Sequence, residues 1–142
     1  MKLVDANVLI YAVNENEPRH DRARNWLDAA LVEGETIGFT WIVLLAFLRL
    51  TTRVGLFPRP LGVAEATGRV RAWLAQPAAL VVEPGARHAD VLSGLLATLG
   101  SGGNLVSDAH LAAIAIEQHA EIVTFDTDFQ RFDDVRSGPP TS

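Results

Sequence analysis

The sequence of 142 residues contains no cysteine and only one lysine, Lys2. The absence of cysteine excludes disulfide bonds, thiolate nucleophiles and zinc sites with cysteine ligands, and it is compatible with a reducing compartment. A single lysine beside the N-terminus excludes the Gly-Lys-Ser/Thr phosphate loop and Schiff-base chemistry in the middle of the chain.

Basic residues are in the minority. Twelve Lys and Arg stand against seventeen Asp and Glu, for a net charge of −5. Since phosphate contacts supply most of the affinity for nucleic acids, such a chain needs a local basic patch or a bridging metal ion to bind them. Arg49 and Arg53 are four residues apart and share a helix face, which is compatible with either a solvated rim or a phosphate-binding patch.

Long apolar runs are also missing. The longest strongly apolar uncharged segment, Thr36 to Leu48, is shorter than the about 20 residues of a membrane-spanning helix, and Asp5 interrupts any apolar signal peptide. We therefore expect a soluble cytoplasmic protein. The length and the 49% hydrophobic content predict a single domain over residues 1–136, followed by a flexible Ser/Gly/Pro-rich tail over 137–142.

Short apolar segments alternate with amphipathic segments along the chain. We expect strands at 2–4, 36–38, 80–82 and 121–125. We expect helices at 8–13, 19–33, 41–54, 64–75, 87–99 and 106–119, and a short turn at 128–132. This alternation predicts an α/β fold, a three-layer α/β/α sandwich whose central sheet is mainly parallel.

Three aspartates occupy positions where parallel sheets bind ligands. Asp5 and Asp126 each follow a predicted strand directly, and Asp108 lies in the first turn of an Ala-rich helix. Carboxylates gathered at one edge repel each other unless a cation lies between them, and Mg²⁺ or Mn²⁺ prefers such oxygen ligands. Each aspartate alone is better explained as a helix cap, a first-turn acid or a loop cap, whereas for the three together a metal site is an equal alternative.

Other constellations are weaker. The histidines show no zinc-binding spacing and are expected on the surface or on the sides of helices; they are His20, His88, His110 and His119. A phosphatase that uses Asp5 as its nucleophile needs a later lysine and a second aspartate at the position of Asn7, and the sequence has neither.

Four blocks of the sequence, in this order, resemble the motifs of PIN-domain ribonucleases: Val4–Tyr11, Phe39–Leu50, Ser107–Ala115 and Val123–Phe129. The small size of the chain resembles the VapC-type toxins of toxin–antitoxin pairs. The resemblance implies a PIN-like sandwich and a Mg²⁺- or Mn²⁺-dependent endoribonuclease whose RNA substrate is commonly transfer RNA. It also implies a cognate antitoxin protein and a homodimer.

The resemblance also implies roles for individual residues. It makes three aspartates catalytic and metal-binding: Asp5, Asp108 and Asp126. It adds Asp128 as a further metal ligand and implies that Asn7 and Thr124 support the site. Beside such a site, we expect Arg49 and Arg53 to bind RNA.

One position departs from the family pattern. The second block usually carries a glutamate, and this sequence has Ala46 there. Because Mg²⁺ readily keeps several water ligands, the loss of one carboxylate need not abolish metal binding, although it lowers the negative charge of the site. The sequence is therefore compatible with an active ribonuclease, or with a weakened or inactive PIN module that acts by binding RNA or a partner.

Overall fold

The computed structural model describes residues 1–32 and 34–141. Within these ranges five short strands form one parallel sheet in the order β3-β2-β1-β4-β5. The strands are β1 (Lys2–Val4), β2 (Ile37–Phe39), β3 (Ala79–Val81), β4 (Glu121–Val123) and β5 (Ser137–Gly138). The helices are α1 (Ala6–Val13), α2 (His20–Val32), α3 (Trp41–Thr52), α4 (Val63–Leu74), α5 (His88–Leu99), α6 (Leu105–Gln118) and the short 3₁₀ helix η1 (Asp128–Arg131).

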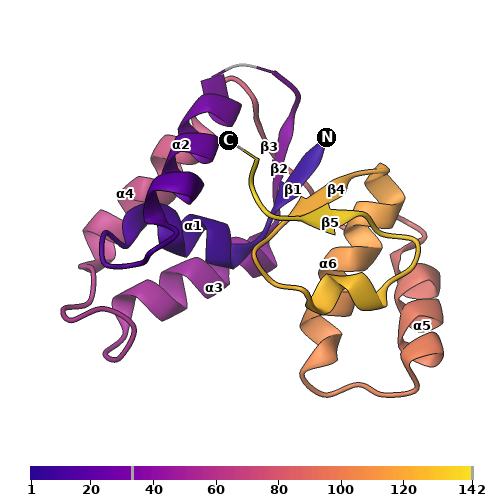
Figure 1. Cartoon of the computed structure of the whole chain (residues 1–142). Coiled ribbons are helices and arrows are strands. Elements are labelled where there is room, and N and C mark those ends of the chain that lie inside the picture. Colours follow the sequence, from indigo (N-terminus) through magenta and orange to yellow (C-terminus); the bar gives the residue numbers. More distant parts are fainter. Residues whose placement is uncertain (33, 142) are drawn as a thin grey trace.

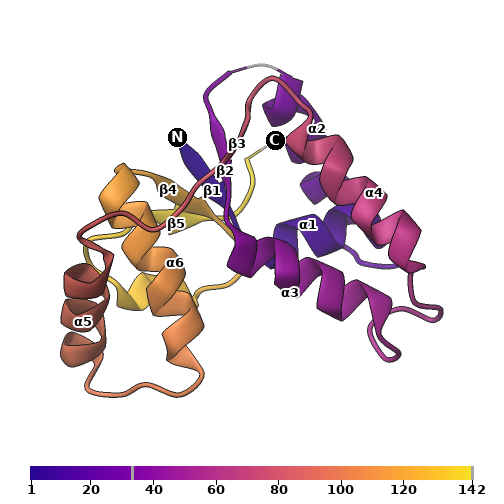
Figure 2. The same cartoon turned by 180° about the vertical axis from the view of Figure 1, so that it is seen from behind.

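Helices cover both faces of this sheet. Helices α1 to α4 lie on one side, and α5 and α6 lie on the other, as the two opposite views show (Figures 1 and 2). The predicted three-layer sandwich with a parallel sheet is therefore confirmed. Every strand runs in the same direction, so the carboxyl ends of β1, β2 and β4 meet at one edge.

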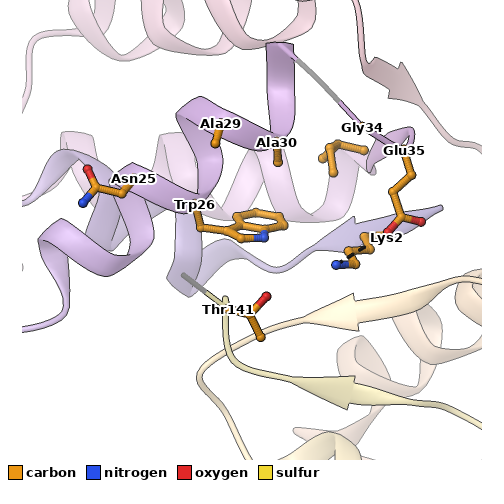
Figure 3. A pocket seen from close by; sticks show the side chains of 9 residues that line it. Lys2, Asn25, Trp26, Ala29, Ala30, Gly34, Glu35 and Thr141 are labelled. Carbon is orange, nitrogen blue, oxygen red and sulfur yellow. Dashed lines mark ion pairs between the residues drawn. The ribbon is translucent and has the colours of Figure 1, made fainter.

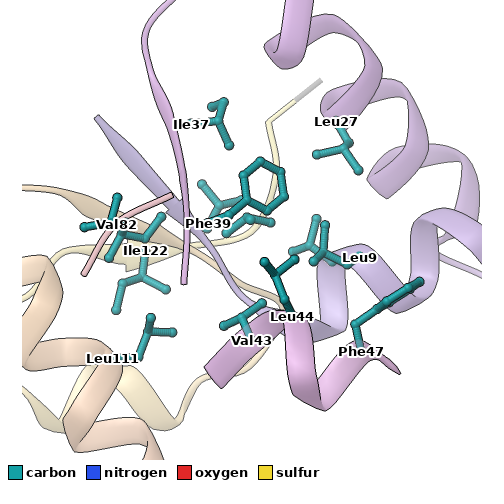
Figure 4. Packing of buried hydrophobic residues seen from close by; sticks show 14 of the residues in the cluster. Leu9, Leu27, Ile37, Phe39, Val43, Leu44, Phe47, Val82, Leu111 and Ile122 are labelled. Atoms are coloured by element: carbon teal, nitrogen blue, oxygen red, sulfur yellow. The ribbon is translucent and has the colours of Figure 1, made fainter. Parts of the chain in front are cut away.

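The core lies on both sides of the three inner strands. Phe39 of β2 is completely buried and lies on the side of Leu9 and Leu44, whereas Ile122 of β4 lies on the side of Leu111 from α6 (Figure 4). Burial on both faces explains why these strands are continuously apolar rather than alternating.

The C-terminal segment differs from the expected flexible tail. Ser137 and Gly138 form β5, which pairs in parallel with β4, and the Thr124 N–H donates to the Gly138 carbonyl over 2.8 Å. The side chain of Arg22 also donates, through Nε, to the carbonyl of Pro140 over 2.8 Å. Backbone groups make these contacts, so a segment without large apolar side chains still joins the sheet.

The side chains of helix α5 are less buried than those of the other α-helices. Within the described part of the chain it has no fully buried residue, and it packs against α6 through half-buried leucines. None of the helices in the described ranges combines the length and the apolar character that a bilayer crossing requires.

Candidate active site

Asp5 connects β1 to α1 at the carboxyl edge of the sheet. Its backbone is extended, and its Oδ1 accepts a hydrogen bond from the Ala6 N–H over 2.8 Å, so it caps the helix. Its Oδ2 accepts a second hydrogen bond over 2.8 Å from the hydroxyl of Thr124, the residue that directly follows the neighbouring strand β4. Parallel pairing of β1 with β4 thus fixes Asp5 on two sides.

Asn7 joins the same two strand ends. Its Nδ2 donates to Thr124 Oγ1 over 2.9 Å and lies 3.3 Å from Asp5 Oδ2. Its Oδ1 accepts from the Phe125 N–H over 3.0 Å. The side chain therefore uses both ends of its amide to hold the start of α1 against the chain that leaves β4.

Asp126 and Asp128 follow on the loop after β4. The Asp126 N–H donates to Thr124 Oγ1 over 3.0 Å, and Asp126 Oδ1 accepts from the Asp128 N–H over 2.9 Å. Asp126 is exposed, and Asp128 forms an ion pair of 3.5 Å with Arg131. Thr124 is thus a common partner of Asp5, Asn7 and this loop.

Asp108 reaches the same region from α6. Partial burial, together with the negative charges of Asp5, Asp126 and Asp128, raises the pKa of Asp108 to about 6, and Arg131 opposes the shift. Burial also raises the pKa of Asp5, although the hydrogen bond from Thr124 opposes that change. The structure therefore brings all four predicted aspartates into electrostatic range of one another.

These carboxylates do not form a ready-made metal cage. Over residues 1–32 and 34–141, no three His, Cys, Asp or Glu side chains are arranged so that they could hold a metal ion. The donor chemistry nevertheless fits a hard divalent cation, because every candidate ligand is a carboxylate oxygen. Burial first, and then the negative charges of three further aspartates, raise the pKa of Asp108, and a cation would neutralise those charges.

The predicted RNA-binding arginines lie elsewhere. Arg49 lines a groove between α3 and α4 with Leu45 and Val63, about 12 Å along α3 from the residue that begins it at the sheet edge. Among the described residues, neither Arg49 nor Arg53 is paired with the acidic group. The basic residue that influences Asp108 is Arg131, which the sequence interpretation did not select.

Two histidines form a network that their spacing did not reveal. His88 of α5 lies 3.1 Å, through Nδ1, from Glu117 Oε1 and 2.9 Å, through Nε2, from His110 Nδ1. Glu117 also accepts from the Gly85 N–H over 3.2 Å. Because the pairing crosses between helices, no local sequence motif reports it; it ties α5 to α6.

Thr40 is a residue of this edge that sequence reasoning treated only as a helix cap. It directly follows β2, the other neighbour of β1, and only 2% of the residue is exposed. Its side chain makes no capping hydrogen bond, and its hydroxyl has no partner within the described ranges. Its position directly after a strand is the signal that could have identified Thr40 as a residue of the carboxyl edge.

A separate cavity of about 370 Å³ lies at the opposite edge of the sheet. Lys2 and Ile37, at the amino ends of β1 and β2, line it together with Trp26 of α2, which Figure 3 shows on the same side of the cavity as Lys2. Lys2 forms an ion pair of 3.5 Å with Glu35 at its rim. This cavity contains none of the predicted site residues.

Sequence comparison identifies relatives over almost the whole chain. Ribonuclease VapC37 of Mycobacterium tuberculosis (strain ATCC 25618 / H37Rv) is 54% identical over 140 residues, which are 99% of this chain and 97% of the relative. Ribonuclease VapC33 of the same strain is 41% identical over 140 residues, which are 99% of this chain and 98% of the relative.

Solved structures share the fold. VapBC2 from Rickettsia felis, bound to a DNA fragment from its promoter, superposes with a TM-score of 0.71 at 20% identity, over 97% of both chains. Mycobacterium tuberculosis VapC20, described as a toxin that cleaves the sarcin–ricin loop, gives a TM-score of 0.69 at 17% identity, over 92% of this chain and 93% of that one. The family described as the PIN domain matches residues 2–135. The chain therefore belongs to the PIN domain family.

Proposed function

We propose that this protein is a metal-dependent endoribonuclease toxin of the VapC type that a cognate antitoxin neutralises. The observation that carries the proposal is the group formed by Asp108 and three further aspartates, since burial and the charges of those three raise the pKa of Asp108. The relatives named Ribonuclease VapC, at up to 54% identity, support the same chemistry. RNA as the substrate assigns the action to the cytoplasm.

The metal ion in this proposal is Mg²⁺ or Mn²⁺. The residues that would hold it are Asp5, Asp108, Asp126 and Asp128. When bound, such an ion acts as a Lewis acid toward the phosphodiester and lowers the pKa of a water molecule.

The surrounding residues hold the aspartates in position. Thr124 and the Ala6 N–H each donate to Asp5, and they favour its ionised form against the effect of burial. Asn7 fixes the distance between α1 and the chain after β4. Because these contacts use neutral donors, they orient Asp5 without neutralising the charge that attracts a cation.

The antitoxin is the expected protein partner. Solved structures with this fold include complexes named VapBC from Rickettsia felis, Haemophilus influenzae and Salmonella typhimurium. This chain exposes Trp41, Leu45 and Val63, and the last two line the groove between α3 and α4. An amphipathic segment of the antitoxin would cover these apolar side chains, and we extend the proposal to a homodimer of the toxin.

The direct test is RNA cleavage by the purified protein without its antitoxin. We expect total RNA and transfer RNA to be cut with Mg²⁺ or Mn²⁺, and the cleavage to stop with EDTA. Asp5→Asn should abolish cleavage, whereas Asp134→Asn, which removes an exposed acid outside the site, should not. Cleavage that survives both chelation and Asp5→Asn would show that the proposal is wrong.

A second candidate function follows from Ala46, which is half-buried in α3. Without a glutamate there, the chain could bind RNA or a partner without turnover. The variant Ala46→Glu separates the two functions, because an added carboxylate should tighten metal binding by about tenfold. A gain in cleavage indicates a weakened enzyme, whereas binding without cleavage in both proteins and with every metal indicates a non-catalytic module.

A further inference from the structure

Two arginines of the α2 region lie against two aromatic rings beside the acidic group. The Arg19 guanidinium carbon is 4.4 Å from the centre of the Tyr11 ring and 5.4 Å from that of Phe125. The Arg22 guanidinium carbon is 5.9 Å from the centre of the Phe125 ring. The two rings are 5.3 Å apart. We call these four residues the cationic–aromatic ledge.

The ledge is continuous with the candidate active site. Phe125 lies in the chain between Thr124, which donates to Asp5, and Asp126, and its N–H is held by Asn7. Tyr11 lies one helical turn after Asn7 on α1. The ledge therefore adjoins the chain segment that carries Thr124 and Asp126.

Within residues 1–32 and 34–141, Arg22 has no acidic partner. Its Nε donates to the Pro140 carbonyl, which is neutral, and no carboxylate of residues 1–32 or 34–141 forms an ion pair with it. Arg24 on the same helix is different, because it pairs with Asp28 over 3.7 Å. The carbonyl of Pro140 fixes the inner nitrogen of Arg22, and among the described residues the two terminal nitrogens make no hydrogen bond, so they can donate to an anion.

Arg19 has a different arrangement. Its Nε donates to Glu17 over 2.7 Å, and Nη2 donates to the Tyr11 hydroxyl over 3.1 Å. These contacts fix the guanidinium over the Tyr11 ring, although 47% of the side chain remains exposed. A guanidinium held in this way offers its outer face as a platform on which a nucleobase stacks.

We infer that the cationic–aromatic ledge binds the RNA strand next to the cleaved phosphate, with Arg22 on a backbone phosphate and an unpaired base stacked over Arg19. The inference rests on the proposed function and adds the residues that bind the strand beside the cut. A chain with net charge −5 and four clustered aspartates repels RNA, so a cation beside the aspartates is needed to bring the strand in. Paired bases stay within their own stack and cannot reach Arg19.

The test is RNA binding without cleavage, measured by fluorescence anisotropy in EDTA and in Ca²⁺. The probes are a labelled single-stranded RNA and a duplex of the same sequence. We expect the wild type to prefer the single strand. Arg22→Gln should weaken binding about fivefold to tenfold and reduce the dependence of log Kd on log salt by about 1, whereas Arg22→Lys should keep most of the affinity. The control Arg24→Gln also removes one positive charge from α2 and should leave binding unchanged.

Stacking is tested separately through Arg19. Arg19→Lys keeps the charge but removes the planar platform, so it should reduce the preference for single-stranded over duplex RNA with little change in the salt dependence. Thermal melting of each variant shows whether the fold is retained.

The results separate this inference from the proposed function. If wild type cleaves RNA but Arg22→Gln binds as tightly as Arg24→Gln, the ledge inference is wrong and the ribonuclease proposal stands. If Arg22→Gln and Arg19→Lys weaken RNA binding but no metal supports cleavage by wild type, the ledge stands and the ribonuclease proposal is wrong. If Arg22→Gln binds RNA normally and loses only the antitoxin, the ledge is an antitoxin contact, which also overturns the inference.

Discussion

The hydroxyl of Thr124 donates to Asp5 Oδ2 over 2.8 Å and links residues that are 119 positions apart in the sequence. The hydroxyl oxygen of Thr124 also accepts hydrogen bonds from the Asn7 side chain and from the Asp126 N–H. One buried hydroxyl therefore connects three parts of the candidate active site by hydrogen bonds.

Replacement of this hydroxyl should impair both stability and cleavage. Thr124→Val leaves Asn7 Nδ2 and the Asp126 N–H without their acceptor, so we expect a loss of about 1–3 kcal/mol in the free energy of unfolding. Because Asp5 also loses an orienting donor, cleavage should fall by about 10- to 100-fold. Urea denaturation and single-turnover cleavage measure the two effects. Thr124→Ser keeps the hydroxyl and serves as the control; a loss in Thr124→Ser without a loss in Thr124→Val would show that the methyl group, not the hydrogen bonds, matters.

Asp108 should make the metal-free protein less stable at neutral pH. Its pKa is about 6 in the folded protein and 3.8 in a solvated chain, so the fold favours the protonated form. This contribution is fully present below the unfolded value of 3.8 and is lost as the pH rises through about 6. Asp108→Asn should therefore stabilise the protein at pH 7 by about 1 kcal/mol, an amount reduced by the solvent that screens this half-exposed carboxyl.

Thermal melting in EDTA between pH 4 and pH 8 measures this effect. The melting temperatures of wild type and Asp108→Asn should nearly coincide at pH 4 and differ by about 3 °C at pH 7. The surface variant Asp134→Asn should follow wild type throughout. A constant difference across the whole range would exclude titration of Asp108 as the cause.

The histidine network should determine how firmly α5 is attached. His88→Ala leaves Glu117 and His110 without their shared partner, and α5 has no fully buried side chain to compensate for this loss. We expect faster hydrogen exchange over residues 88–99, by a factor that corresponds to about 1–3 kcal/mol, and little change in β1 and β4. His119→Ala removes a histidine outside the network and serves as the control. Uniform acceleration across the sheet would mean that His88 stabilises the whole fold.

Removal of the last strand should weaken the candidate active site. Deletion of residues 137–142 removes the Gly138 carbonyl that accepts from the Thr124 N–H, so we expect a loss of about 1–3 kcal/mol and a strong reduction in cleavage. Deletion of 139–142 keeps β5 and serves as the matched control, although it removes the Pro140 contact of Arg22. Normal cleavage after the longer deletion would show that β5 is dispensable.

Apolar patterning predicted most elements of the fold, because side chains dominate their formation. Helix α2 was expected at 19–33 and is observed at His20–Val32, where Trp26 and Leu27 face the core. Strand β5 was not predicted, because Ser137 and Gly138 join the sheet through backbone hydrogen bonds that no hydrophobic pattern reports.

The candidate site was only partly accessible from the sequence. The positions of Asp5 and Asp126 after strands indicated their common edge, since strand ends of a parallel sheet meet. The roles of Arg22 and Phe125 depend on how α2 packs beside the chain after β4, and no local spacing encodes that contact. Among the described residues the Thr40 hydroxyl has no hydrogen-bond partner, and no sequence pattern indicates this, because it follows from burial in the fold.

The bond between the Thr124 N–H and the Gly138 carbonyl also has a consequence for protein synthesis. Asp5 is synthesised before β4 and β5, the strands whose pairing positions its partner Thr124. We therefore expect a growing chain to complete these contacts, and to gain nuclease activity, only after Gly138 has emerged from the ribosome.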